Sequence, residues 1–157
     1  IIVDSFCRTP TEAKIFNTVS DAKVIVATTQ FAPKIRIEEL RSAGAEILIT
    51  NSNDKRVCLT SLMDKLMELD ITSVLIEGGS EIHSSALDAG IVDKIMFFIA
   101  PKLIGGQSAP GIIGGNGIKN LSELVKKRMI AHVDDRGNCI IGSALPHRQI
   151  SKCWNQH

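Results

Sequence analysis

The sequence lacks the cysteine and histidine patterns of a zinc site. Its four cysteines, Cys7, Cys58, Cys139 and Cys153, include no C-x-x-C pair, and its four histidines form no H-x-x-x-H arrangement. The H-x-E and P-C-x-x-C signature of zinc-dependent nucleobase deaminases is also absent. We therefore expect no metal ion, and we expect free thiols that behave mostly as small buried hydrophobes.

The sequence also lacks an excess of charge of either sign and any long apolar run. The 157 residues carry a formal net charge of +1, from 18 basic and 17 acidic side chains, so no nucleic acid or anionic membrane is expected as a partner. No apolar run is long enough to cross a bilayer and no leader pattern opens the chain, so we expect a cytoplasmic protein. Because the chain opens with Ile1, directly in an apolar run, we expect it to be a piece of a longer protein.

Short apolar runs alternate with helical patterns through the middle of the chain. Strands are predicted at residues 1–3, 23–28, 46–50, 73–77, 94–100, 128–133 and 139–143. Helices are predicted at residues 35–43 and 80–89, and a further helix is predicted to begin at a Thr60 cap. The apolar face of this further helix consists of Leu62, Met63, Leu66 and Leu69. The alternation predicts an α/β fold with a largely parallel sheet, and a hairpin turn at residues 134–137 predicts an antiparallel edge.

An apolar strand, a Gly-Gly turn and a helix start follow one another at residues 73–85. The run leads through Glu77 into Gly78 and Gly79, and the helix begins at once with Ser80. Glycines let the backbone approach a ligand closely, and the first N–H groups of a helix favour a phosphate. The turn is therefore a candidate phosphate site at the carboxyl end of a strand. Such turns also occur as tight connections without a ligand, and Glu77 can cap the turn as readily as bind a ligand hydroxyl or amino group.

Other nucleotide-binding patterns are missing. The adjacent glycines do not form G-x-G-x-x-G, and no Gly-Lys-Ser/Thr of a P-loop occurs. Residues 105–117 form a glycine-rich segment that is mostly without charge. No internal repeat is present.

Three short segments carry a more specific signal. They are D-S-x-x-R-T-P from Asp4, E-G-G-S from Glu77 and A-P-K-L-I-G-G from Ala100. In this order and spacing, the chain resembles the reductase domain of the bifunctional riboflavin-biosynthesis deaminase/reductase family over roughly residues 1–145. We divide the chain into residues 1–146, a reductase domain incomplete at its N-terminus, and residues 147–157, a polar tail.

The resemblance implies a dihydrofolate-reductase-like three-layer α/β fold. Its central sheet would be mainly parallel, with antiparallel C-terminal strands and with the family's first strands missing. It also implies NADPH-dependent reduction of 5-amino-6-(5-phosphoribosylamino)uracil to the ribitylamino product of riboflavin biosynthesis, by hydride transfer to the ribosyl C1′. The implied partners are a deaminase domain in the same full-length polypeptide and a second copy in a homodimer.

The segment missing at the N-terminus leads to two expectations. Because it would carry part of the substrate pocket and of the cofactor site, we expect the piece itself to be inactive. In the family's fold, the missing first strand would lie between the strands equivalent to residues 73–77 and 94–100. Because unpaired strand edges recruit partners, we expect these two strands to close up or a second copy to fill the vacant position.

The resemblance also assigns site residues by position. Glu77 resembles the family's substrate-contacting glutamate, and no residue is expected as a catalytic acid or base. The positions that resemble cofactor contacts are Ser5, Gly79, Ser80, Glu81, Ile82, His83, Ser84 and Ser85. His83 can equally be an exposed helix residue, and the A-P-K-L-I-G-G stretch can equally be structural.

Two other functions fit the same residues. One is a dihydrofolate-reductase-like reductase of another pterin-type substrate, which a growth test of the full-length gene in a riboflavin auxotroph would separate. The other is a nucleotide-binding module without catalysis, which the sequence upstream of Ile1 would decide. No arginine for a 2′-phosphate can be placed, so the choice between NADPH and NADH stays open.

Overall fold

The computed structural model describes residues 1–18, 22–102, 105–106, 108–109, 111–117, 128–133 and 139–144. The chain divides into two units, Ile1–Leu75 and Ile76–His157, and each is described by itself. In the described part of the chain, no helix is both long enough and apolar enough to cross a membrane.

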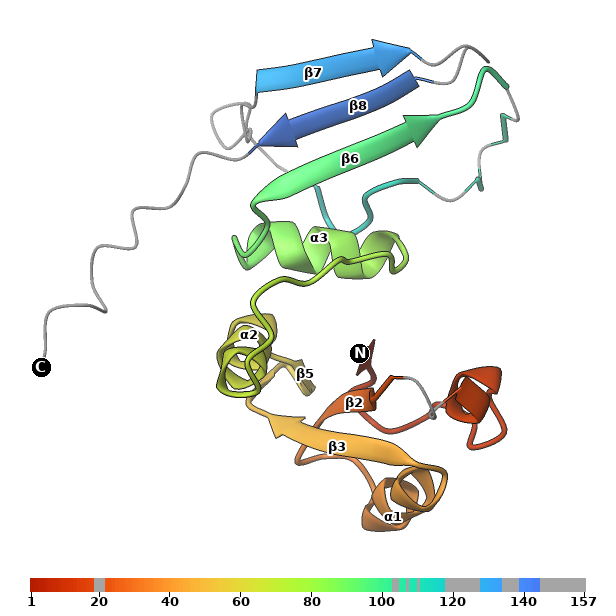
Figure 1. Cartoon of the computed structure of the whole chain (residues 1–157), viewed down its shortest axis with the longest axis vertical. Helices are drawn as coiled ribbons and strands as arrows, with labels where there is room; N and C mark the ends of the chain where they lie inside the picture. Colours follow the sequence, from red (N-terminus) through yellow and green to blue (C-terminus); the bar gives the residue numbers. More distant parts are fainter. Residues whose placement is uncertain are drawn as a thin grey trace, which may run out of the picture. The chain divides into compact units, whose positions relative to one another are not determined.

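A parallel sheet is the centre of the first unit (Figure 1). It consists of β1 (Ile2–Val3), β2 (Val24–Thr29) and β3 (Ala45–Thr50), in the order β1-β2-β3. Val26 of β2 is in register with Ile2 on one side and with Ile47 on the other. Every residue of β2 is buried, as expected for a continuously apolar strand in the middle of a parallel sheet.

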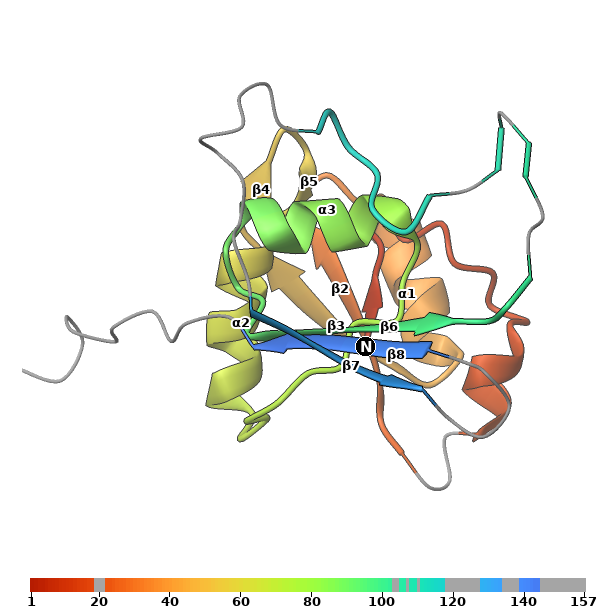
Figure 2. The same cartoon turned by 90° about the horizontal axis from the view of Figure 1, so that it is seen from above.

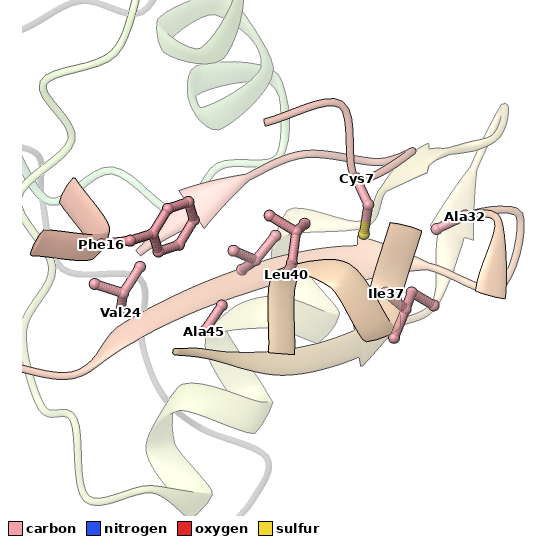
Figure 3. Close-up of a cluster of buried hydrophobic side chains, with 8 residues drawn as sticks. Cys7, Phe16, Val24, Ala32, Ile37, Leu40 and Ala45 are labelled. Carbon is pink, nitrogen blue, oxygen red and sulfur yellow. The ribbon is translucent and has the colours of Figure 1, made fainter. Parts of the chain in front are cut away.

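The hydrophobic core of this unit joins the sheet to helix α1 (Lys34–Ser42) and to the 3-10 helix η1 (Lys14–Thr18) (Figure 3). Leu40 of α1 is fully buried over the sheet, beside Val24 and Val26 of β2. The other buried members of this core are Cys7, Phe16, Ala32, Ile37 and Ala45. Helix α2 (Leu59–Glu68) buries Leu59, Leu62 and Leu66, which repeat at helical spacing.

A tight hairpin joins β3 to α2. Its strands are β4 (Ser52–Asn53) and β5 (Arg56–Val57), which pair antiparallel. The two residues between them, Asp54 and Lys55, have φ angles of 48° and 63°. Positive φ at both central residues matches the twist of a two-residue hairpin.

The predicted cap of α2 is wrong. The helix begins at Leu59, and its N-cap is Cys58 in an extended conformation, without a side-chain cap hydrogen bond. Thr60 is already helical, so its hydroxyl cannot act as the cap. At the other end Leu69 is the C-cap and is 40% exposed, because the helix ends one residue before it.

A three-stranded antiparallel sheet belongs to the second unit (Figure 1). Its strands are β6 (Lys94–Ile99), β7 (Arg128–Val133) and β8 (Cys139–Ala144), in the order β6-β8-β7. Ile141 of β8 is in register with Phe97 of β6 and with Ala131 of β7. The predicted antiparallel C-terminal strands are confirmed, whereas their turn at residues 134–137 and the tail at residues 147–157 lie outside the described residues.

The strand predicted at residues 73–77 is wrong. These residues have no strand conformation, and Val74 and Leu75 are 39% and 81% exposed. A strand needs a hydrogen-bonded neighbour, and no described residue forms a ladder with this segment. The apolar run thus has the composition of a strand without its pairing, so the structure does not test how a vacant position beside it would be filled.

Candidate functional site

Helix α3 (Ser80–Asp88) begins directly after the Gly-Gly turn, as the sequence predicts. Its N-cap is Gly79, which has no side chain to bond to the first N–H groups. The N–H groups of Ile82 and His83 both donate to the Gly79 carbonyl oxygen, at 3.1 and 3.3 Å. The N–H groups of Gly79, Ser80 and Glu81 therefore precede the helical ladder and are the donors that suit a phosphate.

The two glycines of this turn have different surroundings. A Cβ atom on Gly78 would overlap the side chain of Ile82, so this glycine permits the turn to pack against its own helix. A Cβ atom on Gly79 would meet no atom within 4 Å. Among the described residues, no partner is found for the N–H groups of Gly79, Ser80 and Glu81, so the turn stays a predicted site for a phosphate or pyrophosphate group.

A glycine-rich segment, residues 111–117, lies against the first turns of α3 (Figure 2). The Gly114 N–H donates to the carbonyl oxygen of Ser80 at 2.9 Å. The Gly115 N–H donates to Oε1 of Glu81 at 3.2 Å. Sequence patterns did not predict this contact, because nothing local links a glycine-rich segment to a helix some thirty residues earlier; only the glycines themselves signalled a close approach.

Close packing explains the glycines at positions 114 and 115. A Cβ atom on Gly114 would lie 2.6 Å from Oε1 of Glu81 and 3.2 Å from the carbonyl carbon of Ser80. Gly115 has a φ angle of +74°, and a Cβ atom there would overlap the hydroxyl group of Ser84. Any larger residue would push the segment away from α3.

The remaining side chains of the predicted cofactor stretch take part mainly in the helix itself. Ser85 donates its hydroxyl to the carbonyl oxygen of Glu81 at 2.9 Å, and Ser84 is buried. Ile82 is half-buried beside Gly78. The contribution of Ile82, Ser84 and Ser85 to ligand binding stays a prediction. In this prediction the ligand contacts come from the backbone of the first turn.

Glu77 and Ser5 belong to different units. Glu77 is exposed and lies in irregular backbone directly before the Gly-Gly turn. Ser5 follows β1 in the first unit, where its Oγ accepts a hydrogen bond from the Val57 N–H at 3.1 Å. This bond uses one lone pair of the Ser5 Oγ. The hydroxyl proton of Ser5 can therefore point toward a ligand oxygen and donate to it. The substrate role of Glu77 stays a prediction.

Asp4 organises the loop that carries Ser5. Its side chain is buried, and its carboxylate accepts hydrogen bonds from the Phe6 N–H and from the N–H and hydroxyl of Thr9. Burial by itself raises the pKa of Asp4, but the hydrogen bonds from Thr9, Phe6 and Arg8 outweigh it and lower the pKa below its ordinary value. The first of the three short segments, D-S-x-x-R-T-P, is thus in part a loop-forming motif.

Arg36 of α1 holds the same loop from the other side. Its guanidinium donates to the carbonyl oxygens of Cys7 and Thr9, at 3.0 and 2.8 Å. Cys7 has a φ angle of 53° and is fully buried, and its thiol donates to the hydroxyl of Thr28 at 3.3 Å. The family resemblance pointed to Ser5, but the sequence assigned no role to Asp4 or Arg36, which fix the backbone around it.

A second free cysteine, Cys58, is half-buried at the start of α2. A hydrogen bond with the Thr60 hydroxyl, followed by one from the Ser61 backbone, lowers the pKa of the Cys58 thiol. Within the described ranges, no group of at least three His, Cys, Asp or Glu side chains is placed to hold a metal ion.

The chain matches the RibD C-terminal domain family over residues 1–138. It is 39% identical over 129 residues to a riboflavin biosynthesis protein RibD of Actinobacillus pleuropneumoniae, covering 82% of this chain and 34% of the relative. It is 34% identical over 132 residues to a 2,5-diamino-6-ribosylamino-4(3H)-pyrimidinone 5′-phosphate reductase of Aquifex aeolicus, covering 84% of this chain and 58% of the relative. The chain thus spans only about a third to somewhat over half of these relatives.

Solved structures show the same fold. A pyrimidine reductase-like protein of Corynebacterium diphtheriae superposes with a TM-score of 0.69 at 21% identity, over 92% of this chain and 60% of that chain. RibD of Acinetobacter baumannii superposes with a TM-score of 0.70 at 22% identity, over 92% of this chain and 36% of that chain. The parallel sheet with antiparallel C-terminal strands agrees with the expected dihydrofolate-reductase-like fold.

Proposed function

The chain belongs to the RibD C-terminal domain family, and on that premise we propose that it is the reductase part of a riboflavin-biosynthesis enzyme. The proposed reaction reduces the ribosyl group of 5-amino-6-(5-phosphoribosylamino)uracil to an open ribityl chain, with NADPH as the hydride donor. The observation that supports the proposal is the turn before α3, where N–H groups have no partner among the described residues and a Cβ atom on Gly79 would meet no atom within 4 Å.

The first turn of α3 would hold the phosphates of the cofactor. The backbone N–H groups of Gly79, Ser80 and Glu81 would donate to phosphate oxygens, and the positive end of the helix would favour their charge. In the first unit, the Ser5 hydroxyl would donate a further hydrogen bond to the cofactor. When bound, the dinucleotide would supply the hydride, and the protein would orient the partners and exclude water.

Glu77 would bind the substrate. It is exposed directly before the phosphate turn, so a carboxylate that accepts hydrogen bonds is next in sequence to the cofactor site. Hydroxyl and amino groups are the donors that such a carboxylate recognises, and a ribosylamino-pyrimidine carries both.

A closely related substrate is the second candidate. Several relatives are named as reductases of 2,5-diamino-6-ribosylamino-4(3H)-pyrimidinone 5′-phosphate, which differs in the base and keeps the phosphorylated ribosylamino group. Both candidates need the same hydride transfer, so the choice between them depends on contacts to the base.

The assembly completes the proposal. The RibD relative is about three times as long as its matched part, since that part is 34% of its length, which supports a further domain in the full polypeptide. We propose that this further domain is the deaminase, that the full protein acts as a homodimer, and that it works in the cytoplasm.

Turnover by the full-length parent protein tests the function. The protein would be mixed with NADPH and with each of the two pyrimidine substrates in turn, and loss of nicotinamide absorbance would be followed. Faster turnover of the uracil supports the first candidate, and faster turnover of the diaminopyrimidinone supports the second. Failure of both substrates, with NADPH bound, would point to a reductase of another substrate. Failure to bind NADPH would refute the reductase assignment.

A further inference from the structure

Two charged or polar side chains of the predicted phosphate stretch are already engaged within the protein. Nδ1 of His83 lies 3.0 Å from the carbonyl oxygen of Ile112, and Oε1 of Glu81 accepts a hydrogen bond from the Gly115 N–H. Both bonds join α3 to residues 112–115. A third bond, from the Gly114 N–H to the Ser80 carbonyl oxygen, lies between them.

The His83 contact fixes which ring nitrogen carries a proton. A carbonyl oxygen only accepts hydrogen bonds, so Nδ1 of His83 must be the donor to Ile112. In the neutral ring Nε2 then has no proton, and it cannot donate to a phosphate oxygen. His83 therefore suits the loop contact better than a phosphate contact.

The charge of Glu81 leads to the same conclusion. A carboxylate in the first turn of a helix repels a phosphate that binds to the same helix end. In the structure this carboxylate accepts a hydrogen bond from the Gly115 N–H. The adjacent Gly114 lies so close to α3 that a Cβ atom there would not fit. The use of the Glu81 carboxylate is thus to hold the segment and not to contact an anion.

We infer that Glu81 and His83 are positioning residues, which hold residues 112–115 against α3 so that this segment forms one wall of the cofactor site. The inference rests on the proposed function in one respect, namely that the first turn of α3 binds the cofactor. In this inference the backbone of the turn contacts the phosphate, and the side chains of Glu81 and His83 contact residues 112–115.

Matched substitutions separate a loop contact from a phosphate contact. The amide nitrogen of Asn occupies the place of Nδ1, and that of Gln the place of Nε2, so His83→Asn keeps the bond to Ile112 and His83→Gln loses it. In the same way Glu81→Gln keeps an oxygen acceptor for Gly115, and Glu81→Ala removes it. Asp88→Asn, on the last turn of α3, is the control for a general effect on the helix.

Hydrogen exchange measured without cofactor tests the contact itself. We expect the amides of residues 111–117 to exchange about fivefold faster in His83→Gln and Glu81→Ala, as for the loss of one hydrogen bond, and at the parent rate in the three other variants. Equal exchange in all variants would overturn the inference.

NADPH binding to the full-length protein tests the consequence. We expect His83→Gln and Glu81→Ala to weaken binding about fivefold and His83→Asn to bind as the parent does. We expect Glu81→Gln to bind at least as tightly as the parent, because it keeps the acceptor for Gly115 and removes the charge that repels phosphate. The reverse order for His83, with Gln binding tightly and Asn weakly, would show a phosphate ligand and overturn the inference. If the exchange pattern holds and the parent protein binds no NADPH, the contact is established and the proposed function fails.

Discussion

The carboxylate of Asp4 accepts hydrogen bonds from both donors of Thr9, the N–H at 2.7 Å and the hydroxyl at 2.8 Å. This pair closes the loop that follows β1 and carries Ser5. Arg36 completes the loop by donating to its carbonyl oxygens. The loop is therefore held at both its carbonyl and its amide groups before any ligand arrives.

Asp4→Asn tests this arrangement through stability. Asn offers one acceptor oxygen and one donor NH₂ where the loop presents only donors, so a buried donor loses its partner. We expect the free energy of unfolding at neutral pH to fall by about 1–3 kcal/mol, measured by denaturant titration. A change within error would mean that the loop does not depend on the carboxylate.

The same residue predicts a dependence on pH. The pKa of Asp4 is lower in the folded chain than its ordinary value of 3.8, so the carboxylate stabilises the fold fully above that value. This contribution is lost as the pH falls through the folded pKa, because the proton then binds in both states. The stability difference between the parent and Asp4→Asn should therefore shrink below pH 3.8. A difference that stays constant into acid would contradict the lowered pKa.

Gly79→Asp should separate helix stability from cofactor binding. The N-cap has an extended backbone and room for a side chain, so Asp can cap α3 and stabilise it by roughly a few tenths of a kcal/mol relative to Gly. The same carboxylate takes up the free N–H groups and repels phosphate, so NADPH affinity should fall at least about tenfold, or 1.4 kcal/mol.

Gly79→Ala is the matched control for this change. It fills the same space without charge or acceptor, and it should weaken NADPH binding much less than Asp does. Thermal unfolding and isothermal titration of both variants give the two readouts. Equal affinity in the Asp variant and the parent would remove the turn from the cofactor site.

Ser5→Ala should weaken cofactor binding, and it also removes the acceptor of the Val57 N–H. The variant loses the hydroxyl that is free to donate, while Asp4 and Arg36 still hold the backbone. We expect about a fivefold rise in the Kd for NADPH, as for one neutral hydrogen bond. Ser52→Ala, in the neighbouring β4, is the control. A Kd for Ser5→Ala that equals the control value would leave Ser5 a structural residue.

Glu77→Gln should affect the substrate alone. Gln keeps the size and one acceptor but removes the charge, so hydrogen bonds from substrate hydroxyl or amino groups weaken. In the full-length enzyme we expect the KM for the pyrimidine to rise roughly tenfold, with the Kd for NADPH unchanged. Steady-state kinetics and titration measure the two constants. A parallel loss of both would place Glu77 at the cofactor instead.

Two helix ends offer a reciprocal test of backbone strain. Asp70 follows α2 with a φ angle of 60°, and Gly90 follows α3 with a φ angle of 63°; the next residue in each case bonds back to the final turn. Asp70→Gly should stabilise the chain by up to about 1 kcal/mol, and Gly90→Asp should destabilise it by a similar amount. Denaturant titration measures both. A loss of stability in Asp70→Gly would show that the Asp side chain outweighs the strain.

Local sequence patterns predicted those elements whose signal is itself local. The buried strand β2 follows from a continuous apolar run, and the start of α3 follows from two glycines before Ser80. The error at residues 73–77 has a different origin, because an apolar run becomes a strand only when a neighbour pairs with it. The apolar run itself does not determine where a pairing strand lies.

The geometry of the candidate site was predicted to a similar extent. Gly79 and Ser80 were placed at the start of α3 because a helix start is a local feature, and their ligand contacts stay a prediction. The contacts of Glu81 with Gly115 and of Arg36 with the Asp4 loop join residues 34 and about 30 positions apart, and no periodicity reports them. Resemblance placed Glu81 and His83 in the cofactor stretch, but only the geometry shows what their side chains touch.

The exposed apolar run at residues 73–77 also governs how the protein behaves in a concentrated solution. Val74 and Leu75 are exposed, have aliphatic neighbours and form no ladder with any described residue, which is typical of an aggregation-prone segment. Loss of soluble protein should therefore rise with concentration and temperature. A single charge at Leu75, the most exposed of these side chains, is the substitution that would keep the chain in solution.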